Sequence, residues 1–224
     1  MNSKIASEYI LQSLEKQDSG GYANFTKWDL EDSLNRQATD WFRRQVYGTN
    51  QRQEQQEEST MVTDDIQNFL VEKKMSVVNN EFYADSIKIP ENYRYYNKLS
   101  VYCSSGDCKK ILIPSLFIEN ANTDSYSSDW SLSPSFDFEQ CFHVLLNNRF
   151  RVFHMGEFKV DYIRLFYFRE PKKISMDSSN IETEWEWKED VAQLIIENSI
   201  KQLAGSIEHI TANQIADKNQ INNN

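Results

Sequence analysis

The chain has 224 residues and carries 24 Lys and Arg against 34 Asp and Glu, a net charge of −10. Such an acidic surface repels nucleic acid and anionic membranes at long range, which argues against a reader of nucleic-acid sequence. It does not argue against a protein that lines a channel through which DNA slides without binding. No window approaches the ~20 apolar residues of a membrane-spanning helix, so we expect a folded chain with no membrane segment and no targeting signal.

Helical spacing of apolar residues dominates the first fifty positions. An apolar stripe predicts a helix over 3–17. Thr26, with Asp29 three residues later, is a helix-capping pair and predicts a second helix, whose apolar stripe continues to about Tyr47. Residues 48–59 contain no apolar side chain. They indicate an exposed connection or a solvated extension of the helix.

A third helix start stands at Thr63-Asp64-Asp65. The apolar residues that follow it predict a short helix through Val71, and Lys73-Lys74 would complement the negative end of its dipole. We therefore predict that residues 1–74 form the N-terminal part of a helical bundle.

Strand-like patterns replace helical spacing over residues 75–171. Two short β-favouring runs flank Asn79-Asn80, a pair suited to a tight turn with positive backbone angles, and predict a hairpin. Asn147-Asn148 marks another tight turn. The other strand candidates are 87–90, 93–102, 109–113, 142–146, 150–154 and 162–168. Short strands joined by local turns predict a mostly antiparallel β module, as a sheet or small barrel.

A polar stretch over 120–134 predicts a long loop on this β module. Its large side chains include Tyr126 and Trp130. Isolated aromatic residues in a polar loop are candidate partner contacts. The alternative is that both rings pin the loop to the sheet.

Residues 172–218 predict a linker followed by the last helix of the bundle. The linker contains Trp185 and Trp187, two further candidate partner contacts, and a helical apolar stripe then continues to Ile210. Residues 219–224 are polar and predict a flexible tail. The expected fold class is α+β: a helical bundle from the N-terminal helices and the long C-terminal helix, with an inserted, mostly antiparallel β module.

Groups that carry chemistry are sparse. Cys103, Cys108, Cys141 and His143 could form a metal site, but their spacing lacks the two close ligand pairs of structural zinc, and ordinary thiols are favoured. Acidic residues are dense over 182–190, where a negatively charged approach to the last helix is favoured over a catalytic acid and base. We expect no catalytic residue, no metal and no cofactor.

Several short motifs occur in a familiar succession. They are Gly20-Gly21-Tyr22, Trp41-Phe42-Arg43-Arg44-Gln45, Thr63-Asp64-Asp65-Ile66 and Ile89-Pro90-Glu91-Asn92-Tyr93. In this order of elements the chain resembles structural ring, or head-to-tail connector, proteins of crAss-like bacteriophages, which are short-tailed phages of gut bacteria.

The resemblance implies a non-enzymatic virion protein that is made in the host bacterial cytoplasm and sits in the tail or neck. It implies a homo-oligomeric ring, with twelve copies as the suggested number, around the DNA channel between portal and tail. Its partners would be the portal, other tail and neck rings, and passing genomic DNA bound without sequence specificity.

Two functions from other classes stay open. One is a phage or host protein-interaction module that binds its partner at low stoichiometry. The less favoured one is a carboxylate-dependent hydrolase with its site in the β module.

Overall fold

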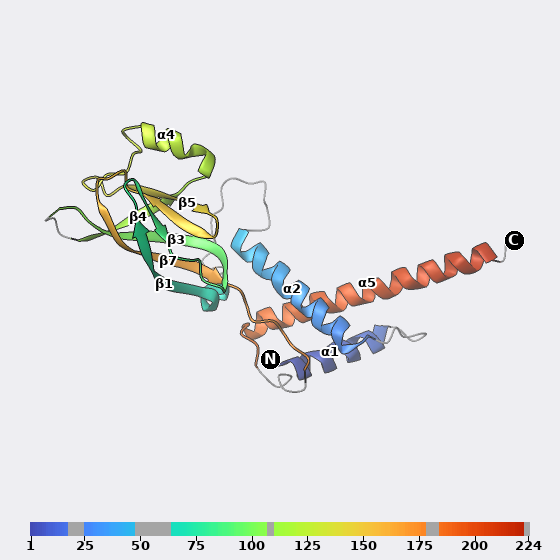
Figure 1. Cartoon of the computed structure of the whole chain (residues 1–224). Helices are drawn as coiled ribbons and strands as arrows, with labels where there is room; N and C mark the ends of the chain where they lie inside the picture. Colours follow the sequence, from blue (N-terminus) through green and yellow to red (C-terminus); the bar gives the residue numbers. More distant parts are fainter. Residues whose placement is uncertain (18–24, 48–63, 107–109, 178–183, 222–224) are drawn as a thin grey trace. The chain divides into compact units, whose positions relative to one another are not determined.

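The computed structural model describes residues 1–17, 25–47, 64–106, 110–177 and 184–221 (Figure 1). The chain divides into two compact units. The helical unit comprises Met1–Asn68 and Pro171–Asn224, and the barrel unit comprises Phe69–Glu170.

The barrel unit is built from seven strands that close on themselves in the order β1-β2-β6-β5-β4-β3-β7. The strands are β1 (Leu70–Asn79), β2 (Tyr83–Ser86), β3 (Tyr93–Ser104), β4 (Ile111–Phe117), β5 (Cys141–Leu146), β6 (Arg149–Phe153) and β7 (Lys159–Arg169). Closure comes from the antiparallel pairing of β1 with β7, which runs from Leu70 opposite Phe168 to Ser76 opposite Tyr162. A closed barrel leaves no strand edge open to pair with another chain.

Alternation along the strands fills the barrel interior. In β7, Ile163, Leu165 and Tyr167 are buried inside, whereas Arg164 and Phe166 alternate with them and are only half-buried. Burying each such aliphatic side chain contributes about 1.5–3 kcal/mol, so the barrel has a core of its own. The interior cluster is Met75, Ala84, Leu99, Val101, Cys103, Ile113, Cys141, Phe150, Val152, Phe158, Val160, Ile163, Leu165 and Tyr167.

Strands β4 and β5 are parallel, in contrast to every other pair of the barrel. Parallel neighbours need a crossover connection of a dozen or more residues. Residues 118–140 supply this crossover, which includes a 3-10 turn, η2 (Asn120–Asn122), and the short helix α4 (Thr123–Ser128). The expectation of a long loop over 120–134 is therefore wrong for its first half.

The expected fold class, a helical bundle with an inserted β module, is wrong. The strands form a closed seven-stranded barrel, and this barrel holds a core of its own. Strand patterns predict that strands exist, but closure depends on the β1–β7 and β4–β5 pairings between distant residues, which no local pattern encodes.

The prediction of a helix from Thr63 through Val71 is also wrong. Only one helical turn at 64–66 and a 3-10 turn, η1 (Gln67–Phe69), precede β1. Leu70 and Val71, expected at the end of a helix, instead pair with β7, as do the residues that follow them. Cross-strand packing outweighs the local capping signal, because tertiary context overrides weak propensities.

The two Asn-Asn pairs behave differently. Asn147 and Asn148 have φ of 49° and 57°, as a tight two-residue hairpin turn requires, so that prediction is confirmed. The hairpin of β1 and β2 is confirmed too, but without positive φ at Asn79 and Asn80. Instead the Asn79 amide bonds both the carbonyl and the N–H of Val160 at 2.7 and 3.1 Å.

The helical unit contains α1 (Ser3–Gln17), α2 (Lys27–Tyr47) and α5 (Glu189–Ile221) (Figure 1). The expected bounds of the first two helices are confirmed, and the C-terminal helix is longer than expected. The capping pair forms as predicted: the Thr26 backbone N–H donates to the Asp29 carboxylate at 2.8 Å, and the Asp29 N–H donates to the Thr26 hydroxyl at 3.3 Å. α5 continues through Ile221, three residues into the expected tail.

At the start of the helical unit's second range, Pro171 to Asp177 form an extended strap that lies along α2. The Asn35 side chain donates to the Ile174 carbonyl at 2.8 Å and accepts from the Ile174 N–H at 2.9 Å. One turn earlier, the Glu31 carboxylate accepts from the Met176 N–H at 3.1 Å. Ile174 and Met176 are buried, so α2 holds the strap by both backbone and side chains.

Replacing Asn35 by Leu leaves the N–H and carbonyl of Ile174 without their partner. We expect the free energy of unfolding of the helical unit to fall by about 1–3 kcal/mol. Urea unfolding followed by tryptophan fluorescence measures it, because Trp41 and Trp187 are buried in this unit, whereas Trp130 of the barrel is already 87% exposed.

Arg36→Leu is the matched control, since it removes an exposed ion pair with Asp32 on the same helix. Such pairs contribute about 0.3–0.5 kcal/mol. Equal losses in the two variants would contradict the role assigned to Asn35.

Candidate interaction surfaces and buried groups

The two tryptophans of the linker lie in the helical unit. Trp187 is only 7% exposed and packs edge-on against Trp41 and Phe42 of α2, with ring centroids 5.5 and 6.2 Å apart. The Trp187 ring therefore packs inside the helical unit and does not face a partner. Trp185 is half-buried and donates its indole N–H to the Ser3 hydroxyl at 3.0 Å, which ties the linker to the start of α1.

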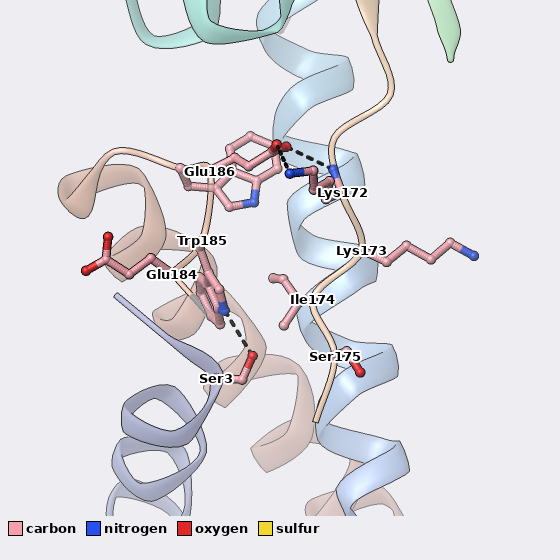
Figure 2. A pocket seen from close by; sticks show the side chains of 9 residues that line it. Ser3, Lys172, Lys173, Ile174, Ser175, Glu184, Trp185 and Glu186 are labelled. Carbon is pink, nitrogen blue, oxygen red and sulfur yellow. Dashed lines mark hydrogen bonds and ion pairs between the residues drawn. The ribbon is translucent and has the colours of Figure 1, made fainter. Parts of the chain in front are cut away.

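A pocket of about 230 Å³ lies between the strap and residues 184–187 of the linker (Figure 2). Figure 2 shows Ile174 pointing into this space and Lys173 pointing away from it. Of its two acids, Glu184 and Glu186, the second accepts from the Lys172 backbone N–H at 3.1 Å and pairs with the Lys172 ammonium at 3.3 Å. These bonds position the carboxylate for holding the strap.

The two aromatic residues of the crossover differ in exposure. Tyr126 of α4 packs on Phe142 with centroids 5.6 Å apart, over an outer cluster of Ile118, Phe142 and Val144. It pins the crossover to the barrel. Trp130, by contrast, is 87% exposed.

Phe138 is a further exposed aromatic residue that sequence reasoning missed, at 73% exposure. Residues 136–139 form a turn between the Ser135 and Gln140 bridge positions, so the side-chain alternation of an extended strand does not apply to them. Phe136 packs on Phe158 of the barrel core at 6.3 Å, and Phe138 faces outward.

α1 carries apolar side chains on its solvent side as well as on its buried side. Ala6 and Ile10 are fully buried. Ile5, Tyr9 and Leu11 are 53%, 48% and 40% exposed. Ile5 and Tyr9 are four residues apart and share one face. Leu11 lies on the other side of the buried stripe, so we call Ile5 and Tyr9 the α1 outer face.

The barrel interior holds the groups that suggested metal or thiol chemistry. Cys103 and Cys141 are buried free thiols, and burial raises the pKa of each to about 12. Thiols that stay protonated are poor nucleophiles and metal ligands. Cys108 lies outside the described residues. Among the residues that the structure describes, no three His, Cys, Asp or Glu side chains gather as metal ligands do.

His143 is fully buried, and its Nδ1 lies 2.8 Å from the Ser115 hydroxyl. Tyr96, Phe117 and Phe150 surround the ring, with centroids 5.3, 5.4 and 5.9 Å away. Burial lowers the pKa of His143 to about 3, so the imidazole is neutral at physiological pH. The Ser115–His143 pair therefore acts as a structural hydrogen bond of the interior.

Neither a protein-family model nor a curated protein matches the chain. Within the described part of the chain, no helix combines the length and apolar character that crossing a bilayer demands.

His143 makes barrel stability depend on pH. In the folded state it binds its proton only near pH 3, whereas an unfolded histidine binds it near pH 6.5. Unfolding therefore takes up a proton between these values. We expect the free energy of unfolding to fall by up to about 1.4 kcal/mol per pH unit as pH drops through this window.

The double variant Ser115→Ala/His143→Leu removes both polar partners and with them this proton uptake. Urea unfolding at pH 7 and pH 4, in parent and variant, measures the difference in slope. The same slope in both proteins would contradict a buried neutral His143.

Proposed function

We propose that the chain is a non-enzymatic virion structural protein that forms a homo-oligomeric ring, as a head-to-tail connector in the phage tail or neck. The observation that carries the proposal is the α1 outer face. A helix that packs its inner side on α5 and keeps large apolar residues outside is suited to a second helical neighbour.

The α1 outer face differs from the inner surface of α1 that packs within the unit. A contact between it and a different patch on the next copy is head-to-tail, and such contacts close into a ring when the rotation between copies allows it. The net charge of −10 supports the proposal further, because a ring with acidic walls lets a DNA duplex pass without strong binding.

The resemblance to ring proteins of crAss-like phages supports the same assignment, with portal, neighbouring rings and passing DNA as partners. The chemistry of the described interior is consistent with it. Cys103, Cys141 and His143 are all held in uncharged forms by burial.

The test is the oligomeric state of the purified full chain. We expect closed rings by negative-stain electron microscopy and a matching discrete mass by mass photometry. The double variant Ile5→Glu/Tyr9→Glu, which places two charges on the α1 outer face, should dissociate the rings at least about tenfold more readily, as losing one buried contact of about 1.4 kcal/mol already does.

Thr39→Glu is the control, since it adds a charge at an exposed polar position of α2 in the same unit. A chain that stays monomeric at high concentration, alone and mixed with virion proteins, would overturn the ring. A fixed one-to-one complex would favour the interaction module.

A further inference from the structure

The crossover presents aromatic side chains from a segment that its own contacts hold in shape. Asp129 accepts from the backbone N–H and the hydroxyl of Ser131 at 2.9 and 2.7 Å. The N–H groups of Leu132 and Ser133 both donate to the Asp129 carbonyl, at 3.0 and 2.8 Å. Trp130 therefore sits inside a closed turn.

The second half of the segment is closed separately. Ser135 and Gln140 exchange two backbone hydrogen bonds of 2.9 Å. Glu139 takes a φ of 53°, the left-handed conformation that reverses the chain before β5. With Phe136 anchored in the barrel core, Phe138 is presented outward by a defined backbone.

We define the crossover epitope as Trp130, Leu132 and Phe138, which are 87%, 43% and 73% exposed. Tryptophan is among the side chains that contribute most to protein interfaces, and a preorganised loop binds with less loss of entropy. Tyr126 remains the anchor of α4 on the outer cluster and is no part of the epitope.

The charge of the crossover indicates which kind of partner surface would fit it. Residues 119–140 contain five acidic residues and no Lys, Arg or His, and all five acids are exposed. They are Glu119, Asp124, Asp129, Asp137 and Glu139. The hydrogen bonds from Ser131 lower the pKa of Asp129, which keeps this carboxylate charged. A complementary surface has apolar sockets with a rim of Lys and Arg.

We propose that the crossover epitope is the docking site of a second, different protein whose contact surface is an apolar socket rimmed by basic residues. A second copy of this chain fits less well, because each copy carries a net charge of −10. Nucleic acid is repelled by the acidic segment. The inference goes beyond ring formation, which uses the α1 outer face of the other unit.

The experiment labels the full chain with 5-fluorotryptophan and follows the fluorine resonance of Trp130, assigned with Trp130→Phe. The probe is a synthetic amphipathic Lys/Leu peptide, and the matched probe is a Glu/Leu peptide of the same length. Trp28 is the internal control, because it is 73% exposed but lies on α2. We expect saturable movement of the Trp130 resonance with the Lys/Leu peptide alone, while Trp28 stays in place.

Phe138→Ser should weaken the Lys/Leu peptide by about tenfold or more, as loss of a central aromatic contact does. The triple variant Asp129→Asn/Asp137→Asn/Glu139→Gln should weaken it and remove its dependence on salt. An unmoved Trp130, an equal shift of Trp28, or equal binding of the Glu/Leu peptide would overturn the proposal. So would a Trp130 shift produced by protein concentration alone, which identifies a second copy, or by a single-stranded oligonucleotide.

Discussion

The parallel pairing of β4 with β5 is the constraint on which the barrel unit depends. Without this pair the ring of strands stays open, and with it the chain must travel from the end of β4 back to the start of β5. Residues 118–140 make that journey over the outside of the barrel. A crossover has to bury something of its own to stay in place, and it does so over Phe142 and Val144. Strand β5 is consequently buried on both faces, with Cys141 and His143 inside.

The same constraint explains where exposed aromatic residues occur in the barrel unit. Tyr126 and Phe136 fasten the crossover to the barrel, on its outer and inner clusters respectively. Between and beyond these anchors the chain is free to carry side chains that the fold does not need. Trp130 and Phe138 occupy those positions. The crossover that the parallel pair requires thus presents exposed aromatic residues, and its acidic residues favour a partner surface of positive charge.

Local signals in the sequence predicted much of the secondary structure. The capping pair at Thr26 and Asp29 fixed the start of α2, and the Asn147-Asn148 pair fixed a hairpin. These features depend on neighbours within a few residues. The pairing of Leu70 with Phe168 that closes the barrel spans 98 positions, and the bond between the strap and Asn35 spans 139. No periodicity reveals either of them. The candidate contacts divide similarly: exposure of Trp130 and burial of Trp187 follow from tertiary packing alone.

The ends of the barrel also determine how the unit responds to force. Its first strand pairs with its last in antiparallel register, and Leu70 lies opposite Phe168 at one end of that ladder. Tension applied through the flanking chain pulls on two adjacent strand ends and opens the hydrogen bonds one after another, like a zipper. The load never shears the ladder as a whole. The barrel unit is therefore mechanically soft along the chain, although its packed interior makes it thermodynamically stable.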